Sequence, residues 1–447
     1  MMTSCTTALL TDEYELTMIR AALASGTAGR SCLFELFGRR LPPGRRYGVV
    51  AGVGRVLEAL ESFRFGEDEL AFLRDRDVID ARTEDFLAGY RFTGSMWGYA
   101  EGDLYFPGSP LLIVRSSFAE AVVLETLLLS IYNFDSAVAS AASRMTMMAE
   151  TRPCIEMGSR RVQERAAVAA ARAAYIAGFS ATSNLEAGRT YGVPTTGTAA
   201  HSFTLLHDTE EAAFAAQLAT LGDETTLLVD TYDIPAAVRT AVRLTSGRLG
   251  AVRIDSGDLR ATAQEVRALL DELGATNTRI IVTSDLDEYQ IAALSGTPVD
   301  GYGVGTALVT GSGAPTCSFV YKLVARAISD EPDAPLQPVA KKSASKSTLG
   351  GRKYAVRHRD DRGIAEAEVI GLDAMPPGDG FERPLLRTLV DHGEPVGAEP
   401  LSTARERHAA ARAELPRDGY KMSRGEPAIP TFFLDRSGVP LPNPYAG

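Results

Sequence analysis

The chain has 447 residues, of which 45% are hydrophobic and 23% are charged, so it is long enough for two domains or for one barrel with additions. The net charge of −11 at pH 7 argues against a surface that binds the phosphate backbone of nucleic acid, so any phosphate site must be local. The four cysteines form no CxxC pair, and neither a signal segment nor a long uninterrupted apolar run is present, which favours a cytoplasmic protein without a membrane span.

The first 150 residues are expected to form two parts. Residues 1–115 mix strand-like runs such as Ser31–Phe37 with helical spacing such as Gly54–Phe63, which indicates an α+β domain. A stretch rich in Ala, Leu and Val follows two serines that suit helix N-caps. We therefore expect residues 116–150 to form a helical connector.

Residues 151–328 alternate short apolar strands with Ala-rich helices, which is the pattern of βα units in an α/β fold. The expected strands are Thr226–Val229, Ala251–Ile254, Arg279–Thr283 and Gly301–Val304, and the expected helices are Glu210–Leu221, Ile234–Thr245, Leu259–Leu273 and Glu288–Leu294. We predict an irregular TIM-like barrel here. The remaining segment, residues 329–447, begins with a proline-rich stretch and is expected to pack on the N-terminal domain.

All four of these expected strands end in polar or glycine residues. They are Asp230, Asp255, Ser284 with Asp285, and Gly303 with Gly305. In a βα barrel the loops after the strands converge on one face, and ligands bind there. This recurrence therefore predicts a site at the C-terminal ends of the strands.

The stretch VRIDSGD, from Val252 to Asp258, allows two interpretations. In the first, Asp255 holds ribose hydroxyls or a magnesium-bound pyrophosphate while Arg253 reaches a substrate anion. In the second, Asp255 and Ser256 only cap the helix that begins near Leu259. The carboxylates after the neighbouring strands favour the first.

The glycines of GYGVGTALVTGSG, which are Gly303, Gly305, Gly311 and Gly313, let the backbone approach a phosphate, although such loops also make ordinary turns. His201 is one of only five histidines, and a single histidine is more often structural than catalytic. Nearby Glu156, Arg160 and Arg161, together with the acids after the strands, supply groups that can orient an imidazole and bind a phosphoryl group.

Taken together, motifs from TDEYELTM at Thr11 to KKSASKSTLGGRK ending at Lys353 resemble those of the nicotinate phosphoribosyltransferase family, which are type II phosphoribosyltransferases. The segment Ala181–Phe203, ATSNLEAGRTYGVPTTGTAAHSF, is similar to the family's segment with the phosphorylated histidine. The resemblance implies that His201 accepts a phosphoryl group from ATP. It also implies an α+β sandwich formed by the N-terminal and C-terminal segments beside the barrel.

The resemblance further implies a homodimer with shared sites, in which Tyr14 of one subunit stacks on the pyridine ring bound by the other. Arg160 would pair with the nicotinate carboxylate or a phosphate. Met157 stands where relatives commonly have an aromatic partner for the ring, and a thioether can pack on an aromatic face. Ser183 and Asn184 offer donors to a carboxylate, while Glu186 is expected to point away.

For phosphoribosyl pyrophosphate, the resemblance implies a set of contacts along the strand ends and in the surrounding domain. Three carboxylates would line the ribose and pyrophosphate region, namely Asp230, Asp255 and Asp285, and Asp255 would also bind magnesium. Gly303 and Gly305 would bind the 5′-phosphate. The anionic ends of the substrate would be reached by Arg39, Lys342 and Lys346.

The implied reaction joins nicotinate to phosphoribosyl pyrophosphate in NAD salvage, with ATP hydrolysis coupled to it. A nicotinamide or a quinolinate phosphoribosyltransferase is the alternative of the same class, and a non-catalytic ligand-binding barrel is the alternative of another class. A Schiff-base lyase is disfavoured, because no lysine lies between Met1 and Tyr321.

Overall fold

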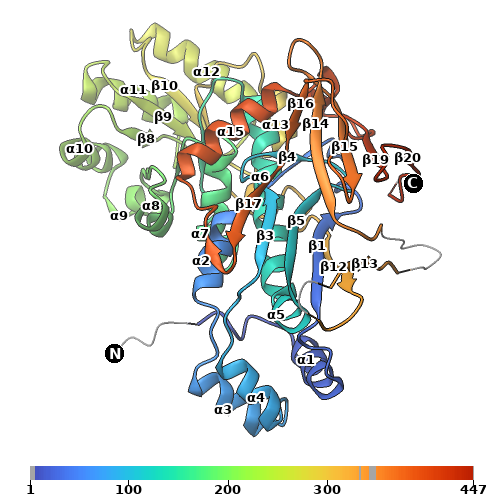
Figure 1. The fold of residues 1–447 in the computed structure, drawn as a ribbon. Helices are drawn as coiled ribbons and strands as arrows, with labels where there is room; N and C mark the ends of the chain where they lie inside the picture. The colour runs from blue at the N-terminus through green and yellow to red at the C-terminus, as the bar shows by residue number, and fades with distance from the viewer. Residues whose placement is uncertain (1–5, 332–333, 342–348, 446–447) are drawn as a thin grey trace. The chain divides into compact units, whose positions relative to one another are not determined.

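The computed structural model describes residues 6–331, 334–341 and 349–445, which form two compact units (Figure 1). Unit 1 contains the residues up to Ala137 and those from Thr316 onward, and unit 2 contains Val138–Pro315. The four segments expected from the sequence, with boundaries after residues 115, 150 and 328, do not coincide with the bounds of these two units and stay a prediction.

Unit 1 is built on a seven-stranded antiparallel sheet in the order β13-β12-β1-β5-β3-β17-β18, so strands from both ends of the chain share it. A five-stranded sheet, β16-β14-β15-β19-β20, and the pair β2-β4 complete the unit. The strands are β1 (Ser31–Gly38), β2 (Gly48–Val49), β3 (Ser95–Tyr99), β4 (Leu104–Tyr105), β5 (Pro110–Ser117), β12 (Phe319–Ala327), β13 (Leu336–Pro338), β14 (Lys353–Arg359), β15 (Ala365–Leu372), β16 (Glu382–Pro384), β17 (Leu386–Asp391), β18 (Glu394–Pro395), β19 (Thr431–Leu434) and β20 (Pro440–Leu441).

The helices of unit 1 are α1 (Glu13–Ser25), α2 (Val53–Glu61), α3 (Glu67–Asp75), α4 (Ala81–Ala88), α5 (Phe118–Val122) and α15 (Leu401–Ala413), with a 3-10 turn at Arg417–Tyr420. The expected helical stretch after Ser117 is confirmed. The Ser117 hydroxyl accepts from the Glu120 amide and caps α5, and the long helix α6 (Glu125–Ala149) follows and continues from unit 1 into unit 2.

Unit 2 holds a six-stranded sheet in the order β7-β6-β11-β10-β9-β8, and every ladder in it is parallel. Its strands are β6 (Cys154–Glu156), β7 (Ala181–Thr182), β8 (Thr226–Leu228), β9 (Ala251–Ile254), β10 (Arg279–Val282) and β11 (Gly301–Val304). The predicted parallel α/β sheet is confirmed, and its form is a half-barrel. Among the described residues no ladder joins β8 to β7, so a fully closed TIM-like barrel is not what the pairing shows.

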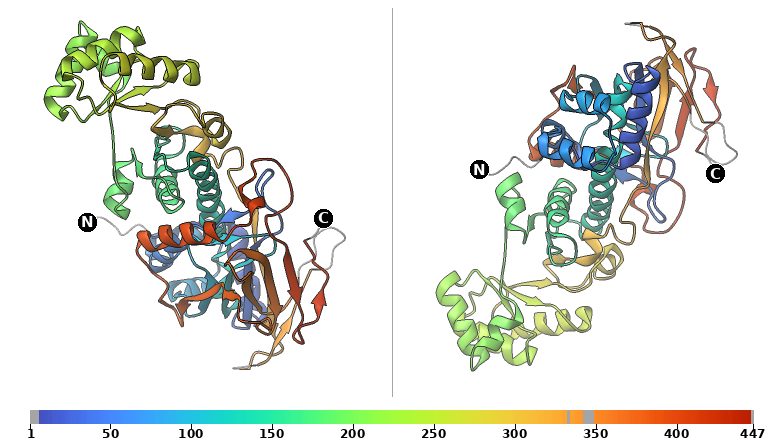
Figure 2. Two further views of the ribbon diagram at one scale, coloured as in Figure 1. Left: turned by 90° about the horizontal axis from the view of Figure 1, so that it is seen from above. Right: turned by 90° about the horizontal axis from the view of Figure 1, so that it is seen from below.

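The helices of unit 2 are α7 (Glu164–Ile176), α8 (Leu185–Tyr191), α9 (His201–Leu206), α10 (Glu210–Leu221), α11 (Ile234–Thr245), α12 (Leu259–Glu272), α13 (Glu288–Ala293) and α14 (Thr306–Val309). In both views of Figure 2 the green and yellow helices of residues 210–272 gather round strands of the same unit. Side-chain caps begin several of them. Thr209, Asp233 and Asp287 each accept from backbone amides in the first turn that follows.

The stretch Phe118–Ala149 is long and apolar enough to cross a membrane by length and composition alone. In the structure 67% of its most apolar window is buried within the protein. Its buried side chains include Asp135 and Arg144, which an apolar bilayer would not accommodate without cost. A packed core helix explains its composition.

Candidate active site

His201 lies beside the two carboxylates that follow β8 and β9. It is the first residue of α9, and its Nε2 is 3.9 Å from Oδ1 of Asp230 and 4.0 Å from Oδ2 of Asp255. Its Nδ1 is 3.1 Å from the hydroxyl oxygen of Thr231. The ring is about two-fifths exposed, at 40% of its side-chain area, so Nε2 stays open to a ligand between the two acids.

Asp230 is the buried member of this group, with only 2% of its side chain exposed. Its Oδ2 accepts from the Asp255 amide at 2.9 Å and from the Ser256 hydroxyl at 2.6 Å. Its Oδ1 is buried and has no hydrogen-bond partner among the described residues. A buried carboxylate oxygen without a donor is costly, so this atom is suited to bind a ligand.

The structure excludes one of the two interpretations of Asp255. The helix α12 is capped by Asp258, whose carboxylate accepts from the amides of Arg260 and Ala261. The capping interpretation of Asp255 and Ser256 is therefore wrong. Asp255 instead accepts a hydrogen bond from the hydroxyl of Thr283, directly after β10, and its second oxygen faces His201.

Arg253, on β9, points to the same region. Its Nη1 donates to the hydroxyl of Thr198 at 2.7 Å, and its Nε is buried without a partner in the described part of the chain. Burial lowers the pKa of this guanidinium; Asp255 and Asp230 act in the opposite direction, and the nearby charge of Arg160 adds to the lowering. Arg253 and Arg160 therefore form a cationic pair that an anionic ligand would stabilise.

The loop after β6 carries Met157 and Arg160 against the end of β11. The Met157 amide donates to the Val304 carbonyl at 2.8 Å. A Cβ at Gly303 would lie 2.4 Å from Cγ2 of Thr283 and 2.7 Å from Sδ of Met157, so only glycine fits there. Gly303 thus has a packing reason as well as the predicted role in phosphate binding.

The loop after β7 contains Ser183 and Asn184. Asn184 accepts from the Ala187 amide through Oδ1, which caps α8, and its Nδ2 donates to the Ser159 hydroxyl at 3.0 Å. Ser183 is exposed. The carboxylate of Glu186 accepts from Arg189 on the same helix, and these hydrogen bonds lower its pKa to about 2. The expectation that Glu186 points away is consistent with this pairing.

The loop after β10 is the strained part of the site. Ser284 has φ of 139°, a region that side-chain-bearing residues rarely occupy. Asp285 next to it is exposed, and together they line a cavity of about 400 Å³ with Asp258 and Arg260. Strain of this kind is often kept where a loop must present groups to a ligand.

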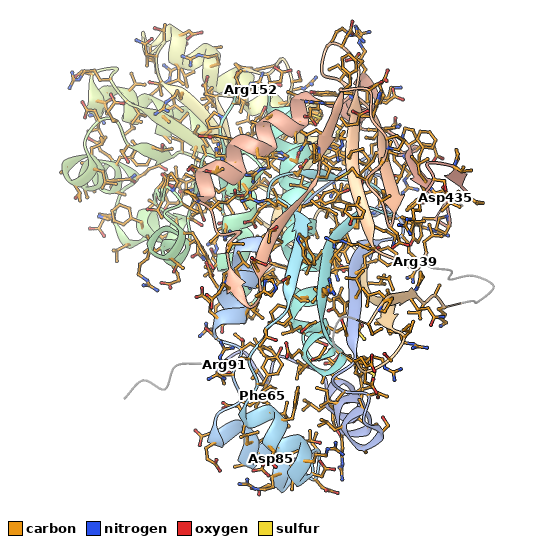
Figure 3. All side chains as sticks on the ribbon, viewed as in Figure 1. Arg39, Phe65, Asp85, Arg91, Arg152 and Asp435 are labelled. Carbon is orange, nitrogen blue, oxygen red and sulfur yellow. The ribbon has the colours of Figure 1, made fainter. Side chains whose placement is uncertain are left out.

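Four predicted residues lie outside unit 2. Tyr14, on α1, is 46% exposed, and burial of its hydroxyl end together with Glu125 raises its pKa to about 12. Arg39 directly follows β1 (Figure 3) and lines a cavity of about 880 Å³ within unit 1. Lys342 and Lys346 lie outside the described residues.

Three hydroxyl groups at this site were not predicted. Thr198, Thr231 and Thr283 bind Arg253, His201 and Asp255, respectively. Two of them follow strands by one or three residues, so the rule that pointed to the acids also covers them. Thr198 could not be found in this way, because it follows none of the expected strands and its partner Arg253 is 55 residues away along the chain.

The residues present fit a magnesium ion in part. Oδ1 of Asp230 has no hydrogen-bond partner in the part of the chain that the structure describes, and Asp255 offers a second carboxylate about two-fifths exposed. Magnesium in proteins is commonly held by one or two carboxylates together with substrate phosphates and water, and this pair meets that requirement.

Comparison with known proteins supports one family. Residues 9–133 match the model of the nicotinate phosphoribosyltransferase N-terminal domain, and residues 153–360 match the nicotinate phosphoribosyltransferase family model. A nicotinate phosphoribosyltransferase of Mycobacterium tuberculosis is 56% identical over 95% of this chain and 94% of its own length. One of Bacillus subtilis is 38% identical over 78% of this chain and 72% of its own length.

Solved structures agree. The crystal structure of human nicotinic acid phosphoribosyltransferase matches with a TM-score of 0.81 at 26% identity, covering 95% of this chain and 97% of that one. A nicotinate-nucleotide pyrophosphorylase from Pyrococcus furiosus matches with a TM-score of 0.73 at 23% identity, over 91% of this chain and 95% of that one, and this likeness concerns the fold alone.

Proposed function

Because this chain belongs to the nicotinate phosphoribosyltransferase family, we propose that it forms nicotinate mononucleotide and pyrophosphate from nicotinate and phosphoribosyl pyrophosphate, with ATP hydrolysis coupled to the transfer. The observation that carries the proposal is the position of His201. Its Nε2 faces the carboxylates of Asp230 and Asp255, which follow neighbouring parallel strands, and Oδ1 of Asp230 is buried without a hydrogen-bond partner within the described ranges.

In the transfer, the ring nitrogen of nicotinate forms a bond to C1′ of the ribose while the bond from C1′ to the pyrophosphate oxygen breaks. Positive charge develops on the sugar, and the carboxylates of Asp230 and Asp255 stabilise it. Negative charge develops on the leaving group, which magnesium bound at these carboxylates would neutralise. No protein nucleophile takes part in this step.

Two arginines suit the substrate anions. We propose that Arg160 binds the nicotinate carboxylate and that Arg253 binds a neighbouring anionic group, since the nearby charge of Arg160 contributes to lowering the pKa of Arg253. Ser183 and Asn184 supply neutral donors beside them. Gly303 and Gly305 bring the backbone close to the 5′-phosphate. Asp285 lines the ribose and pyrophosphate region, and Met157 packs on the pyridine ring.

His201 is proposed as the phosphoryl acceptor for ATP. The lone pair of Nε2 attacks the γ-phosphorus, the bond to the β,γ-bridging oxygen breaks, and ADP leaves; water later cleaves the P–N bond and releases phosphate. The contact between Nδ1 and Thr231 fixes the ring while Nε2 reacts. We assign the reaction to Nε2 because Nδ1 is in contact with the Thr231 hydroxyl.

Several broader features belong to the same proposal. We propose a cytoplasmic homodimer with shared sites, to which Tyr14, Arg39, Lys342 and Lys346 contribute from the domain formed by the two chain ends. That domain would be an α+β sandwich, and the half-barrel would be an irregular relative of the TIM barrel.

The reaction is tested by supplying the purified chain with phosphoribosyl pyrophosphate, magnesium and ATP, and with nicotinate, nicotinamide or quinolinate in parallel. We expect a mononucleotide from nicotinate, with kcat/KM at least about 100-fold above that for nicotinamide, because a mismatched buried polar group goes unpaired. Comparable turnover of nicotinamide would overturn the substrate assignment. Binding without product would instead favour a ligand-binding barrel.

A further inference from the structure

Glu156, the last residue of β6, is a fully buried carboxyl group that connects two loops of the proposed site. One oxygen accepts from the amide of Gly158, in the loop that carries Met157 and Arg160. The other accepts from the hydroxyl of Thr182, the last residue of β7. Its exposed fraction is 0%, and burial raises its pKa.

Thr182 passes this connection on to Asn184. The Thr182 hydroxyl donates to Glu156 and accepts from the Asn184 amide at 2.9 Å. The Asn184 side chain then donates to the Ser159 hydroxyl at 3.0 Å, back in the first loop. These bonds close a ring through Glu156, Gly158, Ser159, Asn184 and Thr182, in which each loop is held by the other.

The ring also reaches the segment that precedes His201. The Thr182 amide donates to the Pro194 carbonyl, and the Thr182 carbonyl accepts from the Thr196 amide, both at 2.9 Å. Two residues later, Thr198 binds the guanidinium of Arg253. Thr182 therefore lies at the junction of three site segments.

The two strands that bear these loops are too short to position them alone. β6 has three residues and β7 has two, so each offers few ladder hydrogen bonds to fix the following backbone. No ion pair with Glu156 is found among the described residues, and a buried carboxyl group without a counter-charge is costly. The hydrogen bonds to the two loops offset that cost, and in return they restrict both loops.

We propose that Glu156 and Thr182 are positioning residues that hold Arg160 and Asn184 in register, and that they thereby determine the preference for a carboxylate on the pyridine ring. Neither residue needs to touch the substrate. This inference rests on the proposed function, and it adds to it the origin of substrate choice.

An isosteric pair of variants tests the connection. Thr182→Val keeps the β-branched shape but removes the hydroxyl, whereas Thr182→Ser keeps the hydroxyl. For Thr182→Val we expect KM for nicotinate to rise about tenfold, kcat to change less than about twofold, and the preference over nicotinamide to fall by a similar factor. Thr182→Ser should restore most of the wild-type KM.

A second variant and a second measurement separate this role from plain stability. Glu156→Gln offers one acceptor oxygen where two are used, so it should raise KM for nicotinate while KM for phosphoribosyl pyrophosphate changes little. Hydrogen exchange of the Asn184 amide, measured without substrate, should be about tenfold faster in Thr182→Val and unchanged in Thr182→Ser.

The outcomes distinguish a failure of the proposed function from a failure of the positioning role. A wild-type chain that does not convert nicotinate would overturn the proposed function, whatever the variants do. An active wild type whose KM and preference are unchanged in Thr182→Val, or are changed equally in Thr182→Val and Thr182→Ser, would overturn only the positioning role. Faster Asn184 exchange together with the KM effect supports it.

Discussion

Nε2 of His201 lies 3.9 Å from Oδ1 of Asp230, and this oxygen is buried without a hydrogen-bond partner among the described residues. The two residues, one at the start of α9 and the other just after β8, are 29 residues apart in the sequence. Their proximity makes the two residues depend on the same ligand, because an ion or phosphoryl group bound by one lies within reach of the other.

Asp230→Asn should lower kcat for nicotinate mononucleotide formation by about 100-fold, since it removes a charge aimed at the reacting groups and keeps the shape of the side chain. Steady-state kinetics with saturating substrates would measure it. The matched control is Asp233→Asn, three residues on, because asparagine caps α11 as well as aspartate does. Equal losses in both variants would contradict the role of Asp230.

Gly303→Ala should weaken activity by displacing its neighbours. The added methyl group would meet Thr283 and Met157 at 2.4 and 2.7 Å, so one of these side chains, or the loop itself, must move. We expect KM for phosphoribosyl pyrophosphate to rise by about tenfold. Gly29→Ala is the control, because a Cβ added there would have no described atom within 4 Å apart from those of its chain neighbours, and its backbone is not left-handed.

The buried carboxyl group of Glu15 should give unit 1 a stability that falls as pH rises. Burial raises its pKa from 4.5 to about 7, even though Thr126 donates to it from both its amide and its hydroxyl. The folded state therefore holds a proton that the unfolded state has lost. Stabilisation by this group is full below pH 4.5 and is lost as pH rises to about 7.

Thermal unfolding of wild type and Glu15→Gln from pH 4.5 to 7.5 tests this. The difference in Tm between them should shift in favour of the variant as pH rises, because glutamine does not titrate. Taking the difference removes groups common to both, such as His408, whose pKa burial lowers to about 3. A difference that does not change with pH would show that Glu15 does not titrate in this range.

Arg357→Met should destabilise unit 1 by about 3–5 kcal/mol, because it leaves the buried carboxylate of Glu368 without its cation, whereas Asp103 keeps its ion pair with Arg383. Arg357 is 1% exposed, and its Nη2 lies 2.6 Å from Oε2 of the fully buried Glu368, with Asp103 also close. Arg362→Met removes an exposed partner of Asp360 and should cost less than about 1 kcal/mol. The free energies of unfolding of the two variants would be compared by urea unfolding. Equal losses of stability would mean that burial does not determine the cost of removing the cation.

The repeating part of unit 2 was predictable from the sequence. The helices α10 and α11 and the strands β9 and β11 begin and end where the periodicity placed them, because apolar strands, polar strand ends and caps all agree there. The same pattern predicted that Asp230 and Asp255 lie together. This pattern is local in the sequence and is repeated at regular spacing. Because the strands are parallel, their C-terminal ends lie at one edge of the sheet.

Other features depended on contacts that local pattern does not contain. β6 and β7 are too short to show periodicity, so the ring through Glu156 and Thr182 was not foreseen. The choice of Asp258 over Asp255 as the cap of α12 is a matter of backbone geometry, since both are suitable residue types. The open edge between β7 and β8 likewise arises from pairing and not from composition.

The role of His201 is tested most directly by incubating the purified chain with ATP labelled in the γ-phosphate and mapping the label by mass spectrometry at alkaline pH, where phosphohistidine survives. We expect an acid-labile phosphoryl group on His201 that is absent from His201→Ala, and this variant should still transfer phosphoribosyl groups slowly without consuming ATP. A label on another residue, or ATP hydrolysis that remains coupled in His201→Ala, would contradict it.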